Sequence, residues 1–157
     1  MTAPPAFAPE VHELLFEHAQ QVAHELGHGQ VEPEDILLAA TRVNSTAQLF
    51  RHLGVQPQEL AQRLFSLARR GSFTQSGKRE YSVRSGRQMI LMWRQARRTG
   101  AKELGAPQVL VAVLQPPPKR FLFLFRLRVP PFWAELQKAG ITEATVQRAI
   151  DETRGAA

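Results

Sequence analysis

The sequence lacks cysteine and lacks long apolar runs, and these absences exclude several classes of protein. Without cysteine among 157 residues, the chain has neither disulfides nor thiolate metal sites. This fits a reducing compartment, and we expect a cytoplasmic protein. No run of about 18 apolar residues is present, so we expect neither a transmembrane helix nor a membrane role. Residues 1–9 have no basic region before an apolar stretch, so they do not resemble a signal peptide.

A nucleotide-binding loop is also missing. The Walker pattern G-x4-G-K-[ST] does not occur, which excludes ATP hydrolysis by that kind of loop. No arrangement of Ser, His and Asp that would support nucleophilic catalysis is recognisable. The sequence therefore predicts a protein that is not an enzyme and needs no cofactor.

Positive charge is in clear excess. The chain has 20 Lys and Arg against 14 Asp and Glu, a net charge of +6. A basic surface attracts polyanions, although a solvated face is the simpler interpretation of such clusters. No helix-turn-helix or aromatic stacking platform is recognisable. A basic helical protein that binds nucleic acid is therefore the third and least favoured hypothesis, and it would show strongly salt-dependent association.

Apolar spacing predicts four helices in the first half of the chain. The first covers residues 10–26, and glycines 27 and 29 end it. The second begins near Pro33, the third runs through residues 47–53, and the fourth opens at Pro57. The polar, glycine-containing residues 69–80 predict a linker. Ser82 then resembles the N-cap of the next helix.

The second half repeats the first. At an offset of 73 residues, apolar positions and a glycine coincide, and later the offset becomes 86. The pairs at 73 are Gly27 with Gly100, Val31 with Leu104, Ile36 with Val109, and Leu37 with Leu110; those at 86 are Phe50 with Leu136, Gly54 with Gly140, and Leu64 with Ile150. The change of offset places an insertion within residues 116–131.

These patterns resemble a known family. Leu26-Gly27-His28, Glu34-Asp35-Ile36-Leu37-Leu38 and Leu53-Gly54-Val55 are similar to the motifs of the Clp repeat, found in the N-terminal domains of Clp-type AAA+ unfoldases. The resemblance implies an all-α fold of two pseudo-symmetric four-helix repeats. It also implies a non-catalytic module that docks a protein partner: an unfoldase, an adaptor or a client polypeptide. We expect a monomer with a disordered tail at residues 1–8, repeat one at 9–68, the linker at 69–80, repeat two at 81–150 and a tail at 151–157.

The resemblance also suggests where a ligand would bind. In some relatives, paired sites bind phosphorylated arginine through a Glu in the second helix and a Thr at the start of the first. Carried over within each repeat, the first site has Glu34 but Pro9, and the second has Ser82 but Pro107. Each site is half present, so we do not expect phosphoarginine binding. Glu34, Asp35 and Ser82 remain candidate protein-binding residues.

One motif supports an alternative function. His24-Glu25-Leu26-Gly27-His28 matches H-E-x-x-H, which binds zinc in metallopeptidases when both histidines lie on one helical face. Glu34 would be the third ligand. Gly27 and Gly29 favour ending the helix before His28, and the second repeat has no matching ligands. A small zinc metallopeptidase is therefore the second hypothesis, with no metal site expected under the first.

The insertion is the part least similar to the family. Residues 116–131 alternate phenylalanine, leucine and arginine between proline clusters, so a plain helix is not expected. A strand, a hairpin arm or an ordered loop would each fit. If this segment is buried, it extends the core. If it is exposed, it forms a site for a partner. The candidate binding residues here are Phe121, Phe123, Phe125, Arg126 and Arg128.

Overall fold

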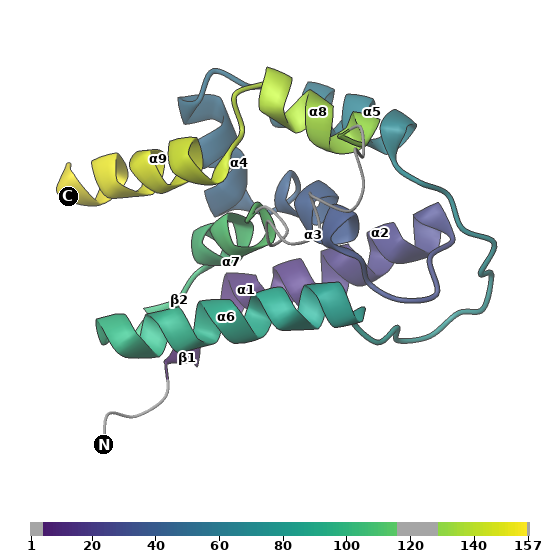
Figure 1. The fold of residues 1–157 in the computed structure, drawn as a ribbon, viewed down its shortest axis with the longest axis horizontal. Helices are drawn as coiled ribbons and strands as arrows, with labels where there is room; N and C mark the ends of the chain where they lie inside the picture. Colours follow the sequence, from purple (N-terminus) through teal and green to yellow (C-terminus); the bar gives the residue numbers. More distant parts are fainter. Residues whose placement is uncertain (1–4, 116–128, 157) are drawn as a thin grey trace.

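Helices dominate the architecture, which confirms the predicted all-α class. The structure is a computed structural model, and it describes residues 5–115 and 129–156 (Figure 1). Within these residues the helices form two groups joined by an extended segment, and the strands are two residues long. No helix in this part of the chain is both long and apolar enough to cross a bilayer.

The first repeat begins with one long helix whose middle is a π-helix. Proline occupies the first turn of α1, α3 and α5, where its missing N–H is no loss. Gly27 ends the long helix in a left-handed conformation with φ of 71°. The elements are α1 (Pro9–His12), the π-helix η1 (Glu13–His18), α2 (Ala19–Leu26), α3 (Pro33–Ala40), α4 (Asn44–His52) and α5 (Pro57–Leu67).

The second repeat reproduces this order. Its helices are α6 (Val83–Thr99), α7 (Ala106–Val113), α8 (Pro131–Lys138) and α9 (Glu143–Gly155). Both ends of α7 lie 73 residues after those of α3, and α9 starts 86 residues after α5. Gly100 and Gly140 are left-handed, as are Gly27 and Gly54 at the corresponding helix ends. The predicted duplication is therefore visible in the backbone.

The π-helix marks a difference of one residue between the repeats. The long helix of repeat one spans 18 residues, whereas α6 spans 17. A π-helical turn accommodates one extra residue within an otherwise regular helix. The residues before the two helices, Ala8 and Ser82, therefore correspond at an offset of 74, although the glycines after them correspond at 73.

The core lies between the repeats. Helices α3 and α7 occupy the centre and pack against each other, with α6 along one edge of the molecule (Figure 1). The paired apolar positions found in the sequence are buried on both: Ile36, Leu37, Val109 and Leu110 are at most 1% exposed. Helices α5 and α8 also pack together across the two repeats. Neither repeat thus encloses its own core.

Short parallel strand pairings tie the start of each repeat to the other. Strand β1 (Ala6–Phe7) pairs with β2 (Glu103–Leu104), and Tyr81 pairs with Val31 in an isolated bridge. Ala8 N donates to Leu104 O at 2.9 Å, and Ser82 N donates to Val31 O at 3.0 Å. Because Val31 and Leu104 are repeat-related, the two ties are equivalent. The residues that precede each long helix are thus hydrogen-bonded to the opposite repeat.

Regular structure extends further than we predicted at both ends. We predicted a disordered tail over residues 1–8, but residues 6 and 7 of this segment form strand β1. They are ordered because their backbone pairs with β2. Helix α9 continues to Gly155, beyond the predicted end of repeat two at residue 150. The predicted linker has no helix or strand, but Gly71 N and Phe73 N donate to the carbonyl oxygens of Leu26 and Gly27.

Candidate functional site

Glu34 lies at a junction between the two repeats. The Trp133 Nε1–H of α8 donates to its Oε1 at 3.1 Å, and the guanidinium of Arg84 in α6 lies 3.8 Å from the same oxygen. Arg84 also sits over the Trp133 ring, 5.3 Å from its centroid. The carboxylate is half-buried and already has an indole N–H and a guanidinium of its own chain as partners.

The candidate residues are paired differently from our expectation. We paired Glu34 with Pro9 inside repeat one, but the structure places Glu34 beside the start of α6, where Ser82 is the N-cap. Pro107 lies instead beside the start of α1, in a groove it shares with Ala8 and Glu10. The reason is the cross-repeat pairing, which brings each long helix to the opposite repeat. The N-cap of α1 is Ala8, since the π-helix shifts the correspondence by one residue.

Pro107, the repeat-two counterpart of Glu34, lines an open groove on the other side of the molecule. It has a volume of about 700 Å³ and lies between α4, α9 and the starts of α1 and α7. By the offset of 86 residues, Ala47 of α4 corresponds to Trp133, the residue that contacts Glu34. Glu10 Oε1 accepts from Ala106 N at 3.1 Å and so caps α7. The two halves have therefore diverged, since an indole N–H bonds Glu34 on one side and a small alanine is the related residue on the other.

Asp35 has a structural role, which corrects its selection as a binding residue. Its side chain is fully buried, and its Oδ2 accepts from the Glu32 backbone N–H at 2.7 Å. The His28 Nδ1–H donates to the two carboxylate oxygens at 2.9 and 3.0 Å. The His28 Nε2–H donates to the carbonyl of Arg69 at 2.7 Å. An imidazolium would donate from both ring nitrogens and so satisfy the Asp35 carboxylate and the Arg69 carbonyl together.

Hydrogen bonding and burial shift the pKa of both members of this pair. The hydrogen bond to Asp35 and its negative charge raise the pKa of His28, outweighing the opposing effect of burial. Burial raises the pKa of Asp35, against the lowering effect of its hydrogen bonds. Through the hydrogen bonds of His28 to Asp35 and to the Arg69 carbonyl, the pair connects the start of α3 to the start of the linker.

The H-E-x-x-H residues have contacts that serve the fold. Helix α2 ends at Leu26, so His28 does not lie on the same helical face as His24. The buried Arg79 donates to His24 Nδ1 at 3.1 Å and to His28 O at 2.6 Å, and Glu25 pairs with Arg42. Within the part of the chain that the structure describes, no three His, Cys, Asp or Glu side chains gather to hold a metal ion. The geometry therefore argues against the zinc hypothesis.

The remaining candidates divide into one buried residue and one group that the structure does not describe. Ser82 is 6% exposed, and its Oγ accepts from Ser85 N at 3.2 Å, which confirms the predicted N-cap but removes Ser82 from the surface. Phe121, Phe123, Phe125, Arg126 and Arg128 lie outside the described residues. Their role stays a prediction.

The most accessible candidate surface is one we did not select from the sequence. The outer side of α6 exposes Val83, Ile90 and Leu91 at 84%, 53% and 45%. Its inner side carries the buried Met92 and Ala96. The signal was present in the sequence: Ile90 and Leu91 fall off the apolar stripe formed by Met89, Met92 and Ala96. Large apolar side chains left in solvent mark an interaction surface when they gather on one face.

Two interlocked helical repeats define a small all-α domain built from a duplicated unit. The sequence profile of the Clp repeat (R) N-terminal domain family matches residues 7–123 of the chain. The chain belongs to this family, as its motifs indicated. Domains of the family are non-catalytic protein-interaction modules of Clp and Hsp100 chaperones.

Solved structures share the fold at low sequence identity. The Hsp104 N-terminal domain from Candida albicans superposes with a TM-score of 0.69 at 13% identity, covering 97% of this chain and 93% of that one. A structure from preliminary investigations of a malarial protein secretion system has a TM-score of 0.69 at 13% identity, covering 94% and 93%. No curated protein sequence matches the chain. At this identity the structural likeness concerns the fold alone.

Proposed function

We propose that this domain docks adaptor or client polypeptides for a Clp-type AAA+ unfoldase, and that the outer face of α6 is the docking surface. The observation that carries the proposal is the exposure of Val83, Ile90 and Leu91 on one helix whose opposite side is anchored in the core. A helix fixed in this way presents its side chains without the ordering cost of a mobile segment. Family membership supports a protein as the partner.

Binding of a permanently unfolded polypeptide tests this function. The probe is fluorescently labelled, reduced and carboxymethylated α-lactalbumin, and its anisotropy is followed as the full chain is added. We expect saturable binding. Ile90→Gln combined with Leu91→Gln should weaken it at least tenfold, because each apolar side chain buried in a complex contributes about 1.5–3 kcal/mol.

The matched control removes two exposed apolar side chains elsewhere. Leu67, 39% exposed on α5, and Val129, 50% exposed before α8, are both replaced by glutamine. This variant should bind the probe like the unmodified chain, and circular dichroism should show equal helicity for all three proteins. The proposal is wrong if the unmodified chain does not bind, or if the two double variants bind equally well.

A further inference from the structure

All the charged side chains of helix α6 are arginines. Between Val83 and Thr99 it contains five arginines and no acidic residue. The arginines are Arg84, Arg87, Arg94, Arg97 and Arg98. Acidic residues are common elsewhere in the chain, which has 14 of them. The helix therefore has a local charge that its own residues do not neutralise.

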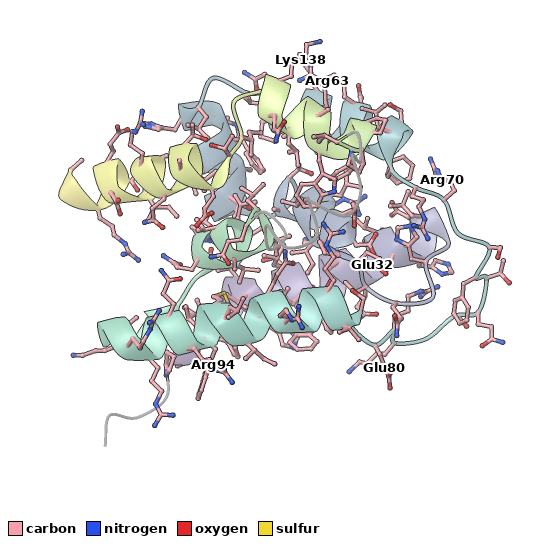
Figure 2. All side chains as sticks on the ribbon, viewed as in Figure 1. Glu32, Arg63, Arg70, Glu80, Arg94 and Lys138 are labelled. Atoms are coloured by element: carbon pink, nitrogen blue, oxygen red, sulfur yellow. The ribbon has the colours of Figure 1, made fainter. Side chains whose placement is uncertain are left out.

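Three of these guanidinium groups are without an ionic partner in the described chain. Arg84 faces Glu34, and Arg97 lies over the Trp93 ring, 5.5 Å from its centroid. Among the residues that the structure describes, neither a salt bridge nor an aromatic stack engages Arg87, Arg94 or Arg98. All three are exposed, and Arg94 projects from α6 away from the other helices (Figure 2). A partner would thus meet guanidinium groups that are free to bind.

The free arginines and the exposed apolar residues form one stripe. At 100° per residue, six side chains fall within an arc of about 100° on the helix surface. These are Val83, Arg87, Ile90, Leu91, Arg94 and Arg98. The stripe is about 22 Å long at a rise of 1.5 Å per residue, and its arginines are separated by about 10 Å and 6 Å along the axis. These separations equal those of residues seven and four apart on a second helix.

We propose that the α6 stripe, defined by these six residues, binds an acidic amphipathic helix of a partner protein. The partner would place carboxylates opposite Arg87, Arg94 and Arg98 and apolar side chains opposite Ile90 and Leu91. Guanidinium groups suit this role because they bind carboxylates in a bidentate manner. The inference rests on the proposed docking function and adds the chemistry of the partner.

A protein helix fits the stripe better than an anionic bilayer does. Stable interfacial binding needs a broad apolar face, often with aromatic residues. The stripe has three aliphatic side chains, two of them on consecutive residues, and no aromatic one. Arg87 precedes the Ile90–Leu91 pair, and Arg94 and Arg98 follow it, which suits a partner helix with carboxylates on both sides of an apolar centre. Membership in a family of protein-interaction modules points to the same kind of partner.

Two designed peptides test the proposal against the full chain by fluorescence anisotropy. One is a helical peptide of about 18 residues, with glutamates at alternating seven- and four-residue spacing beside a leucine stripe. The other replaces every glutamate with glutamine. We expect the acidic peptide to bind at least tenfold more tightly at low salt, and this preference should shrink as added salt screens the charges.

Charge-matched variants show whether the stripe itself is responsible. Arg87→Gln with Arg94→Gln should weaken binding of the acidic peptide at least tenfold. Arg51→Gln with Arg148→Gln removes the same charge from exposed positions on α4 and α9 and should change binding less than twofold. Equal loss in both variants would show general charge attraction and overturn the proposal. Equal binding of the two peptides would also overturn it.

Two further results separate this inference from the docking function. If the unfolded probe depends on Ile90 and Leu91 but the acidic peptide has no advantage, the inference fails and the docking function stands. If neither probe responds to any α6 variant, both fail. Vesicles of phosphatidylcholine and phosphatidylglycerol form the last arm. Their binding through Arg87 and Arg94, without preference between the peptides, would identify a lipid surface and overturn the proposal.

Discussion

At the scale of single residues, His28 connects three parts of the chain. Its ring joins the start of α3, through Asp35, to the start of the linker, through the carbonyl of Arg69. Its own carbonyl accepts from the buried Arg79 near the end of that linker. The family motif that includes His28 thus has a physical explanation, since a protonated histidine donates to both groups and its pKa is raised. Its contribution to stability depends on its charge and so on pH.

We predict that His28 stabilises the fold most at mildly acidic pH. The folded pKa of His28 is raised above 6.5, so its contribution is complete below pH 6.5 and is lost as the pH rises through the folded value. Urea unfolding of the unmodified chain and His28→Gln should therefore differ by about 2 kcal/mol near pH 6. The difference should shrink steadily toward pH 9.

His52→Gln is the control for this pH series. His52 pairs with Glu152 on the surface, at 3.0 Å, where both side chains are about half exposed. Exposed ion pairs contribute about 0–1 kcal/mol, so this substitution should have little effect at any pH. A difference between the unmodified chain and His28→Gln that stays constant from pH 6 to pH 9 would contradict the assignment of an imidazolium.

Tyr81 offers a second pH-dependent measurement. Burial raises its pKa to about 12, and its hydroxyl donates to Leu15 O at 2.5 Å. Because the chain has a single tyrosine, the ultraviolet absorbance of tyrosinate reports this group alone. We expect a midpoint near 12 in the folded protein and near 10 in denaturant. A folded midpoint near 10 would show that the hydroxyl is accessible to water.

At the scale of the elements, glycines end the long helices and also permit a close backbone contact. Gly27 has φ of 71°, and a Cβ at this position would lie 2.6 Å from the Gly71 carbonyl oxygen. Gly54 has φ of 77°, but a Cβ there would meet nothing within 4 Å. The two glycines share a backbone conformation and differ in surroundings, which makes them a matched pair.

We predict that Gly27→Ala is clearly more destabilising than Gly54→Ala. The left-handed conformation costs alanine about 1–2 kcal/mol at either position. At Gly27 the contact with Gly71 should add about 1–3 kcal/mol, because the linker must move. Chemical denaturation of both variants measures the difference. Equal losses would indicate that the linker is not packed against the end of α2.

Local signals allowed prediction of most helices but not of the site. Proline at helix starts and glycine at helix ends have fixed backbone preferences, so Pro33, Pro57, Gly27 and Gly100 mark boundaries that the structure confirms. Glu34 and Ser82 lie near each other because Val31 pairs with Tyr81, which is far from it in the sequence. No local pattern encodes that pairing. The π-helix could not be predicted from the sequence either. One extra residue leaves the apolar spacing on both sides of it unchanged.

At the scale of the whole molecule, the fold is held together across the repeats. Helix α3 packs on α7 and α5 packs on α8, and the residues before each long helix pair with the backbone of the other repeat. Separated from its partner, either half would expose the apolar faces of its central helices to water. This arrangement also anchors the first turn of α6, since Ser82 N and Ser85 Oγ donate to the carbonyl oxygen of Val31 in repeat one.

We therefore predict that the two repeats stay folded and associated after the linker is cleaved, and that neither repeat folds alone. A protease site inserted between Thr74 and Gln75, both exposed, opens the linker without breaking a cross-repeat hydrogen bond. After cleavage the two fragments should elute together and unfold in one transition. Residues 1–74 or 75–157 alone should show reduced helicity and no cooperative melting, and mixing them should restore both. A single half that melts cooperatively within about 5 °C of the cut chain, a difference worth roughly 1–2 kcal/mol, would contradict a core shared between the repeats.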